Sequence, residues 1–205
     1  LTLKGICHFI EHMASEGTSK RKSFQNRKEI LNVGGKVGAG IGDDYTFYYH
    51  LIPPDQLDLS LDIMSGILSD LIFPANRIEA ERRLIYAELK AAQEKSLTRA
   101  WLGIFDLIWQ DTPYHRDLEI EIRNTMRFHR QQLLEYYLLS YTLGKTTVVI
   151  LGDVDPDKVI ARVAHWFKNA RFSRRDCGSS RLPDTFFGFR EKTEKAAIAT
   201  AVSRR

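Results

Sequence analysis

The sequence predicts a single α+β domain over residues 1–205, with helices packed on a sheet. Apolar residues spaced four and three apart run from Leu57 to Leu71, the spacing of a helix that buries one face. Aromatic and β-branched residues fill 45–52, and a second β-branched run fills 146–151, as in strands. With 43% hydrophobic residues, a chain of this length can bury a core of its own.

The first half of the chain should contain a strand between helical segments. Residues 45–52 form the strand, and the helix from Pro54 to Leu71 begins at a proline pair followed by an aspartate. Its apolar stripe should pack on the sheet. Pro74 begins a longer helical stretch, which is rich in helix formers and continues towards Trp109.

The second half is expected to continue the mixture of helices and strands. Phe128 to Tyr137 forms a helix, and the strand at 146–151 is followed by a Gly-Asp turn. Asp157 to Lys168 forms the next helix. Lys195 to Val202 is expected to be a further strand that leads onward.

Two histidines and a glutamate on the first helix suggest a metal site. His8 and His12 stand four residues apart, so they share a helix face and could bind one tetrahedral zinc ion at about 2 Å. Glu11 is then left free to take a proton from the attacking water. A histidine pair can also be an ordinary core or surface feature of a helix, so the site depends on a third ligand from elsewhere.

Two glutamates on the later helix are candidates for that ligand. Glu81 and Glu88 are seven residues apart, almost two whole turns, and therefore point the same way. A catalytic zinc site needs three protein ligands and one open position. The alternative is that both carboxylates are solvated and pair with Arg82, Arg83 or Lys90.

The motif order resembles that of a known family. In H-x-x-E-H the glutamate directly precedes the second histidine, which is the inverted order of the inverzincins, and Gly17-Thr18 follows. Together these residues resemble the signature of the insulinase/pitrilysin family of zinc metallopeptidases, which includes the mitochondrial processing peptidases. The resemblance implies the N-terminal catalytic half of that fold, an antiparallel sheet with helices packed on it.

The resemblance also implies a role for each candidate residue. His8, His12 and Glu88 would bind one Zn²⁺, and Glu11 would be the general base. Glu81 would support the site from outside the set of ligands. Since all these positions are intact, the resemblance favours an active enzyme.

A glycine-rich stretch concerns the substrate. Residues 34–49 resemble the family's edge strand, which accepts substrate backbone by β-augmentation, and Gly38 and Ala39 are the positions expected to meet substrate. Gly38 stands where the family has asparagine and Ile41 where it has threonine, so we expect a side-chain contact to be lost. A nucleotide loop is the other interpretation, but such a loop opens a helix, and here a strand follows.

The function implied is that of a zinc-dependent metalloendopeptidase acting on peptides or extended polypeptide segments. Members of the family enclose substrate between homologous halves, so a second half or a partner subunit is expected, as is a strand before Leu1. The alternative is a non-catalytic or partner-dependent zinc-binding subunit. Erosion of the metal motif, the usual mark of such subunits, is not found here.

Charge and hydropathy argue against two other classes. The net charge is +4, and Lys20-Arg21-Lys22 is the only run of three basic residues, so nucleic-acid binding is not indicated. No apolar run approaches the roughly 18 residues of a membrane span, and no signal-peptide pattern opens the chain. We expect a cytoplasmic protein. A periplasmic or organellar location stays open, because the expected first strand would precede Leu1.

Overall fold

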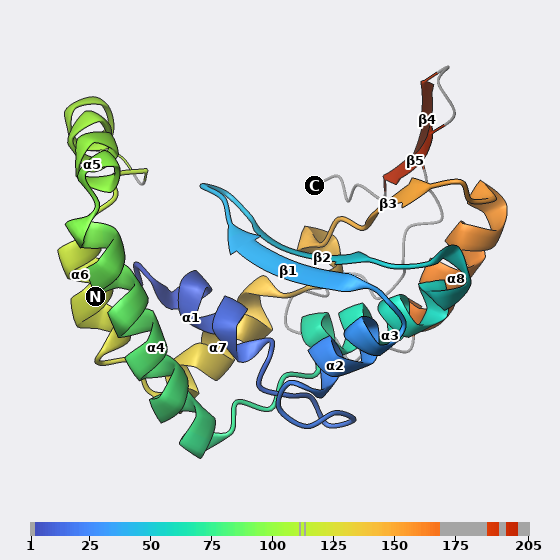
Figure 1. Cartoon of the computed structure of the whole chain (residues 1–205), viewed down its shortest axis with the longest axis horizontal. Helices are drawn as coiled ribbons and strands as arrows, with labels where there is room; N and C mark the ends of the chain where they lie inside the picture. Colours follow the sequence, from blue (N-terminus) through green and yellow to red (C-terminus); the bar gives the residue numbers. More distant parts are fainter. Residues whose placement is uncertain (1–2, 111, 113, 169–187, 193–195, 201–205) are drawn as a thin grey trace.

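A computed structural model describes residues 3–110, 112, 114–168, 188–192 and 196–200 (Figure 1). It confirms the predicted α+β class. The elements, in chain order, are α1 (Ile6–Met13), α2 (Gln25–Asn32), β1 (Lys36–Ile41), β2 (Thr46–Leu51), α3 (Leu57–Ser69), α4 (Ala75–Glu94), α5 (Ser96–Trp109), α6 (Leu118–Thr125), α7 (Arg130–Ser140), β3 (Val149–Gly152), α8 (Pro156–Lys168), β4 (Gly188–Lys192) and β5 (Ala196–Thr200). The expected elements other than the long helical stretch lie where predicted, with ends shifted by up to three residues. Of the strand expected from Lys195 to Val202, residues 196–200 form β5, and both predicted ends lie outside the described residues.

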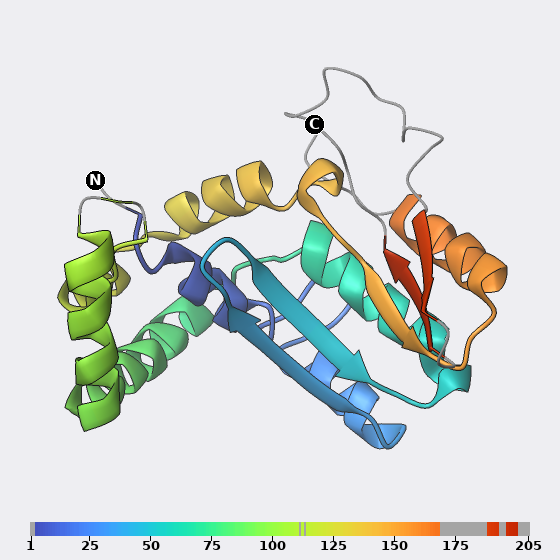
Figure 2. The ribbon, with the colours of Figure 1, turned by 90° about the horizontal axis from the view of Figure 1, so that it is seen from above.

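The strands are antiparallel, as expected. β1 and β2 form a hairpin in which Lys36 is opposite Leu51 and Ile41 is opposite Thr46. The second sheet has the order β3-β5-β4. Helices α1, α2 and α3 lie on one side of the hairpin, and β3 lies beyond β2 when the molecule is seen from above (Figures 1 and 2).

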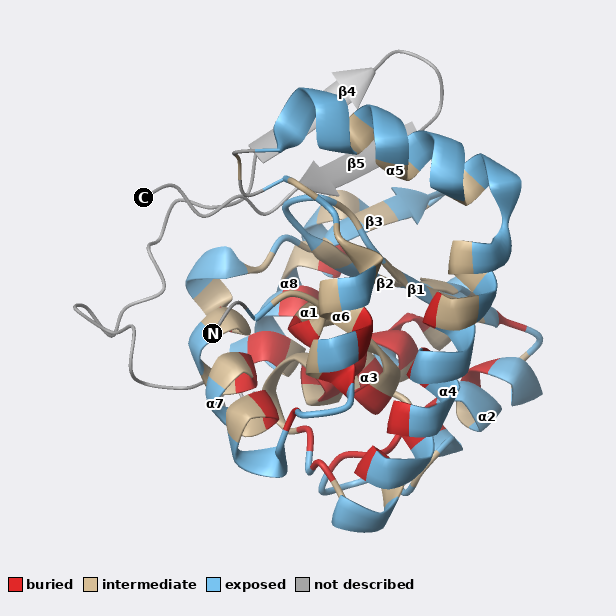
Figure 3. Cartoon of the chain, turned by 90° about the vertical axis from the view of Figure 1, so that its left-hand side faces the viewer, coloured by how far each residue is buried: buried red, intermediate tan, exposed pale blue. Residues whose placement is uncertain are grey.

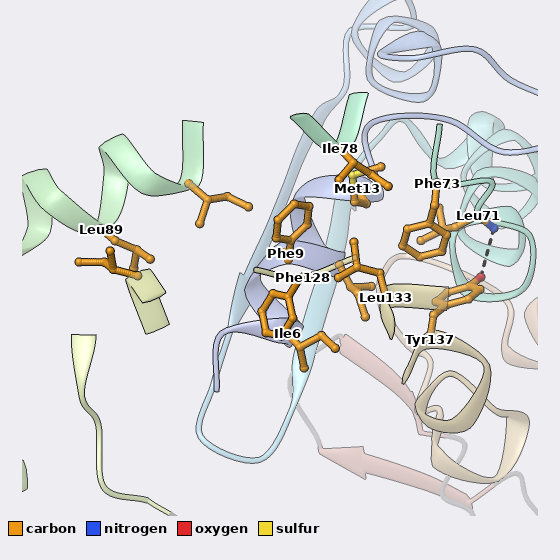
Figure 4. Packing of buried hydrophobic residues seen from close by; sticks show 13 residues of the cluster. Ile6, Phe9, Met13, Leu71, Phe73, Ile78, Leu89, Phe128, Leu133 and Tyr137 are labelled. Carbon is orange, nitrogen blue, oxygen red and sulfur yellow. Dashed lines mark hydrogen bonds between the residues drawn. The ribbon is translucent and has the colours of Figure 1, made fainter. Parts of the chain in front are cut away.

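The main core holds α1 against α4, α6 and α7. Buried residues gather where these helices meet (Figure 3). Phe9 of α1 is fully buried, with its ring edge-on to Phe128 at a centroid distance of 6.3 Å (Figure 4). Burying such a side chain stabilises a fold by about 1.5–3 kcal/mol. The cluster therefore fixes α1 relative to α4, the two helices that carry the candidate metal ligands.

A buried tyrosine ties α7 to the end of α3. The Tyr137 hydroxyl donates to the carbonyl of Ile67 at 2.9 Å and accepts from the amide of Leu71 at 3.3 Å, the bond drawn in Figure 4. Leu71 lies just beyond α3 and packs in the same cluster. The chain leaving α3 is thus held in place before it enters α4.

The apolar stripe of α3 packs only in part as expected. Leu57, Leu61 and their neighbours meet α8 and Ile150 of β3. It is Ile63 and Ile67, on an adjacent face, that pack on the hairpin with Val37 and Tyr48. Helix α3 therefore lies between α8 and the hairpin, and the prediction that its stripe covers a sheet holds for β3 alone.

The expectation of one continuous helix from Pro74 towards Trp109 is wrong, because the structure has two helices there. Lys95 is extended, with φ −72° and ψ 124°, and separates α4 from α5. An extended residue interrupts the N–H to C=O ladder of a helix, whatever the propensities of its neighbours. Helix α5 stands away from the core, with Trp101 55% and Leu107 85% exposed (Figure 3).

Candidate metal centre

Helix α1 presents its two histidines towards α4, on a face that is less buried than its apolar face. Its apolar residues Ile6, Phe9, Ile10 and Met13 are buried, which leaves both imidazoles partly exposed. The helix starts after Gly5, whose φ of 88° is readily adopted by glycine alone. The amphipathic pattern of α1 therefore decides which side chains face α4.

Three donor atoms converge between α1 and α4. His8 Nε2 lies 3.5 Å from Glu88 Oε2, and His12 Nε2 lies 3.2 Å from the same oxygen. One donor atom from each residue lies within 4.8 Å of the others. Donors about 2.0–2.1 Å from a tetrahedral zinc ion are about 3.3–3.4 Å apart, close to both distances measured from Glu88, so these three residues could hold such an ion. The Glu88 side chain is 58% exposed, so the site faces solvent.

A buried carboxylate lies behind His12. Glu81 Oε2 is 2.9 Å from His12 Nδ1, and the Glu81 side chain is only 6% exposed. A carboxylate that accepts the Nδ1 proton leaves the lone pair on Nε2, the nitrogen that faces Glu88. The structure thus places Glu81 beside His12 and outside the group of three donors.

Glu11 lies on the same helix and is half-buried. Burial raises the pKa of its carboxyl; the charge of His12 opposes this, while the carboxylates of Glu88 and Glu81 add to it. The Glu11 carboxyl is therefore close enough for the charges of all three residues to affect its pKa. A carboxyl group whose pKa is raised is suited to accepting and returning a proton in a reaction.

Burial and the neighbouring His12 lower the pKa of His8, although Glu88 opposes both effects. Burial also acts to lower the pKa of His12, but the hydrogen bond to Glu81 and the nearby carboxylates outweigh it and raise that pKa. The two imidazoles thus differ in basicity because only His12 has a buried carboxylate partner.

The predicted substrate strand lies beside α1 and forms half of the hairpin. Among the strands that the structure describes, β1 pairs only with β2, so its other edge is open. Gly38 is opposite Tyr49 and Ala39 is opposite Tyr48. A Cβ at Gly38 would collide with the ring of Tyr49, so this ring covers the glycine.

Two charged residues near the site were not singled out from the sequence. Glu16 follows α1 and its side chain is 0% exposed, and the guanidinium of Arg77 in α4 binds it. The only local signal was that Arg77 stands four residues before Glu81. Such pairs are frequent on exposed helices and do not by themselves indicate a site.

Comparison with known proteins identifies relatives over most of the chain. The family model of the insulinase peptidases (Peptidase family M16) matches residues 2–123. An uncharacterized zinc protease of Rickettsia felis is 25% identical over 185 residues, which are 90% of this chain and 44% of that protein. The mitochondrial-processing peptidase subunit beta of Dictyostelium discoideum is 27% identical over 187 residues, 90% of this chain and 40% of that protein.

Solved structures show the same fold. A protease from Helicobacter pylori matches with a TM-score of 0.78 and 20% identity, over 89% of this chain and 44% of that one. A peptidase M16 inactive domain from Pseudomonas fluorescens matches with a TM-score of 0.69 and 16% identity, over 82% of this chain and 41% of that one. The chain therefore spans about two fifths of the length of these proteins. In its described part, no helix has the length and apolar character needed to cross a membrane.

Proposed function

The chain belongs to the insulinase family of peptidases, and from this premise we propose that it is a zinc-dependent metalloendopeptidase acting on peptides or extended polypeptide segments. The observation that carries the proposal is the convergence of His8, His12 and Glu88. The two histidine nitrogens lie 3.5 and 3.2 Å from Glu88 Oε2, close to the donor spacing of a tetrahedral zinc site, although His12 and Glu88 are 76 residues apart in the sequence. Relatives named as zinc proteases support the choice of metal.

Each residue of the site has a distinct task. His8, His12 and Glu88 would hold the ion, and Glu81 would orient His12 through its Nδ1 proton. When bound, Zn²⁺ supplies Lewis-acid chemistry that activates water and polarises the scissile carbonyl. Glu11 takes the proton of the attacking water and carries it to the leaving amine, so one carboxylate serves both proton transfers.

The open edge of β1 is the proposed place for the substrate. A peptide added there as a further strand would bind through its backbone, next to Gly38 and Ala39. Backbone pairing tolerates many side chains. This mode suits a peptidase that acts on varied extended segments.

The proposed partner of this chain is a second, homologous half of the peptidase. The chain covers 44% of the Rickettsia protein and 40% of the Dictyostelium protein, and so matches a part of each. We propose that a homologous half, in the same polypeptide or in a partner subunit, closes over the substrate. The site would then act fully only in that assembly.

The second candidate function is a non-catalytic or partner-dependent zinc-binding subunit. The solved domain from Pseudomonas fluorescens, which has the same fold, is described as inactive, so the fold does not by itself imply hydrolysis. The convergence of the three donors, together with a half-buried Glu11 on the helix that carries both histidines, favours the enzyme for this chain.

Hydrolysis of a quenched fluorescent peptide library by the purified protein separates the two functions. Wild type and Glu11→Gln are assayed with zinc, alone and with a candidate second half. We expect cleavage by wild type and no cleavage by Glu11→Gln, although the variant keeps its zinc. Equal cleavage by both would reject Glu11 as the base, whereas zinc binding without cleavage in any assembly would favour the subunit.

A further inference from the structure

We propose that Arg77 is a positioning residue of the metal site, which acts by holding the carboxylate of Glu81 in the orientation that binds His12. The inference rests on the proposed zinc site. It adds two residues, Glu16 and Arg77, which lie next to Glu81 and are not among the three candidate donors.

The anchor of Arg77 is a fully buried carboxylate. The Glu16 side chain is 0% exposed, and Arg77 donates to both of its oxygens, through Nε to Oε2 and through Nη2 to Oε1 at 2.9 Å. The Ser23 hydroxyl also donates to Oε2, at 2.7 Å. A buried carboxylate needs such partners, and the planar guanidinium satisfies both oxygens in one geometry. The position of Arg77 is therefore fixed.

The same guanidinium reaches Glu81. Arg77 Nη2 lies 3.9 Å from Glu81 Oε1, while Glu81 Oε2 lies 2.9 Å from His12 Nδ1. The two oxygens of Glu81 are thus divided between a cation on one side and the imidazole on the other. The Glu16 and Glu81 carboxyl groups are also within hydrogen-bonding reach of each other. Two carboxylates this well buried repel each other, and the charge of Arg77, which pairs with both, offsets that repulsion. Without it, Glu81 would lose the charge that keeps it turned towards His12.

The loop after α1 is shaped around Arg77. The ring of Phe24 lies 5.4 Å from the guanidinium carbon, within the range of a cation–π contact. Phe24 has φ 60° and ψ −1°, a left-handed conformation that is uncommon for a bulky residue and persists only where its surroundings hold it. Ser23 and Glu16 belong to the same loop. Two side chains of one short segment, Glu16 and Phe24, therefore contact Arg77 from outside the helix that carries it, and Ser23 supports Glu16.

The expected effect is on zinc affinity, because Arg77 acts through Glu81 on His12. Loss of an outer partner of a metal-binding histidine typically weakens metal binding by about 10–100-fold. Arg77 is one contact further out, so we expect Arg77→Met to weaken zinc binding by about tenfold. Cobalt bound in place of zinc should show an altered visible spectrum, since its bands report the geometry of the ligands.

The test is a double-mutant cycle read by competition for Zn²⁺ with a chromophoric chelator. Wild type, Arg77→Met, Glu81→Gln and the double variant are compared, with Arg130→Met as the control. Arg130 donates to the carbonyls of Ile72 and Phe73, so its loss also removes guanidinium hydrogen bonds but does not touch Glu81. In the Glu81→Gln background we expect Arg77→Met to change zinc affinity by less than about twofold, because the carboxylate through which Arg77 acts on His12 is already absent.

Each outcome decides between explanations. Unchanged zinc affinity in Arg77→Met, or an equal loss in both Glu81 backgrounds, would overturn the positioning role. If wild type binds no zinc, the proposed zinc site itself fails. If Arg77→Met does not fold, Arg77→Lys is measured instead. That variant keeps the positive charge but loses the bidentate hydrogen bonding to Glu16, so we expect a partial loss of zinc affinity. An unchanged zinc affinity would count against the proposal.

Discussion

His12 Nδ1 lies 2.9 Å from Glu81 Oε2, and the opposite nitrogen of the same ring, Nε2, lies 3.2 Å from Glu88 Oε2. One imidazole is thus held between a buried carboxylate and an exposed one. The buried partner sets the ring's orientation and tautomer, and the exposed partner lies where a shared ion would draw both donors together. Glu81 and Glu88, on one helix, thus have different roles, and the first two predictions test each of them.

Glu81→Gln should weaken zinc binding by about tenfold or more, because a neutral amide is a poorer acceptor for the Nδ1 proton of His12. Competition with a chromophoric chelator measures the change. Glu79→Gln is the matched control, since Glu79 lies on the same helix with its side chain 61% exposed and pairs with Arg82. An equal loss of affinity in both variants would show that the effect comes from the charge of the helix and not from the contact with His12.

Glu88→Gln should separate metal binding from folding. The Glu88 side chain is 58% exposed, so we expect the free energy of unfolding of the metal-free protein to change by less than about 0.5 kcal/mol. Zinc affinity should fall by more than in Glu81→Gln, because a ligand is lost and not its support. Urea unfolding and chelator competition measure the two quantities, and a zinc affinity equal to that of wild type would exclude Glu88 as a ligand.

Tyr137→Phe should destabilise the metal-free protein by about 1–3 kcal/mol, since the amide of Leu71 and the carbonyl of Ile67 lose a buried partner. Urea unfolding measures this change. Tyr45→Phe removes a hydroxyl from a residue that is 65% exposed and should change stability by less than about 0.5 kcal/mol. A similar effect of both substitutions would contradict the role given to the Tyr137 hydrogen bonds.

His50 should make the protein less stable in mild acid. Burial lowers the pKa of His50 to about 4, and its Nδ1 lies 2.8 Å from the Ser60 hydroxyl oxygen. Between pH 6.5 and 4 the unfolded chain therefore takes up a proton at this residue that the folded chain does not. The contribution of neutral His50 to the free energy of unfolding is complete above pH 6.5. It falls by roughly 1–3 kcal/mol as the pH drops to 4.

The measurement is the pH dependence of urea unfolding for the metal-free wild type and His50→Gln. The variant should lose part of the decline in stability between pH 6.5 and 4. His165→Gln, which removes an exposed imidazole, is measured alongside as the control for the loss of a histidine. Identical slopes in wild type and His50→Gln would contradict the lowered pKa.

Local spacing singled out the two histidines and two candidate glutamates, and the family resemblance then selected Glu88 as the third donor. His8 and His12 share a helix face because they are four residues apart, and Glu81 and Glu88 share one because they are seven apart. What spacing cannot show is a contact between distant segments. Glu16 and Arg77 are separated by 61 residues, and nothing in the surroundings of Glu16 in the sequence indicates that its carboxylate is fully buried.

Parts of the fold escaped prediction for different reasons. Residues 118–123 alternate apolar and charged side chains as a strand would, yet they belong to α6, where the Asp117 side chain accepts from the amide of Ile120 and caps the helix. Helix α2 buries only Asn26 and Ile30, so its apolar periodicity is weak. The end of α4 at Lys95 was missed because the neighbouring residues are mostly helix formers, whereas the backbone of Lys95 is extended.

The most direct test of the zinc site is the metal content of the purified protein after dialysis against zinc-free buffer, measured for wild type, Glu11→Gln and a variant that combines His8→Ala with His12→Ala. The account predicts one zinc ion per chain in wild type and in Glu11→Gln, and none above background in the histidine variant. Wild type without zinc, or a histidine variant that retains a full equivalent, would contradict it.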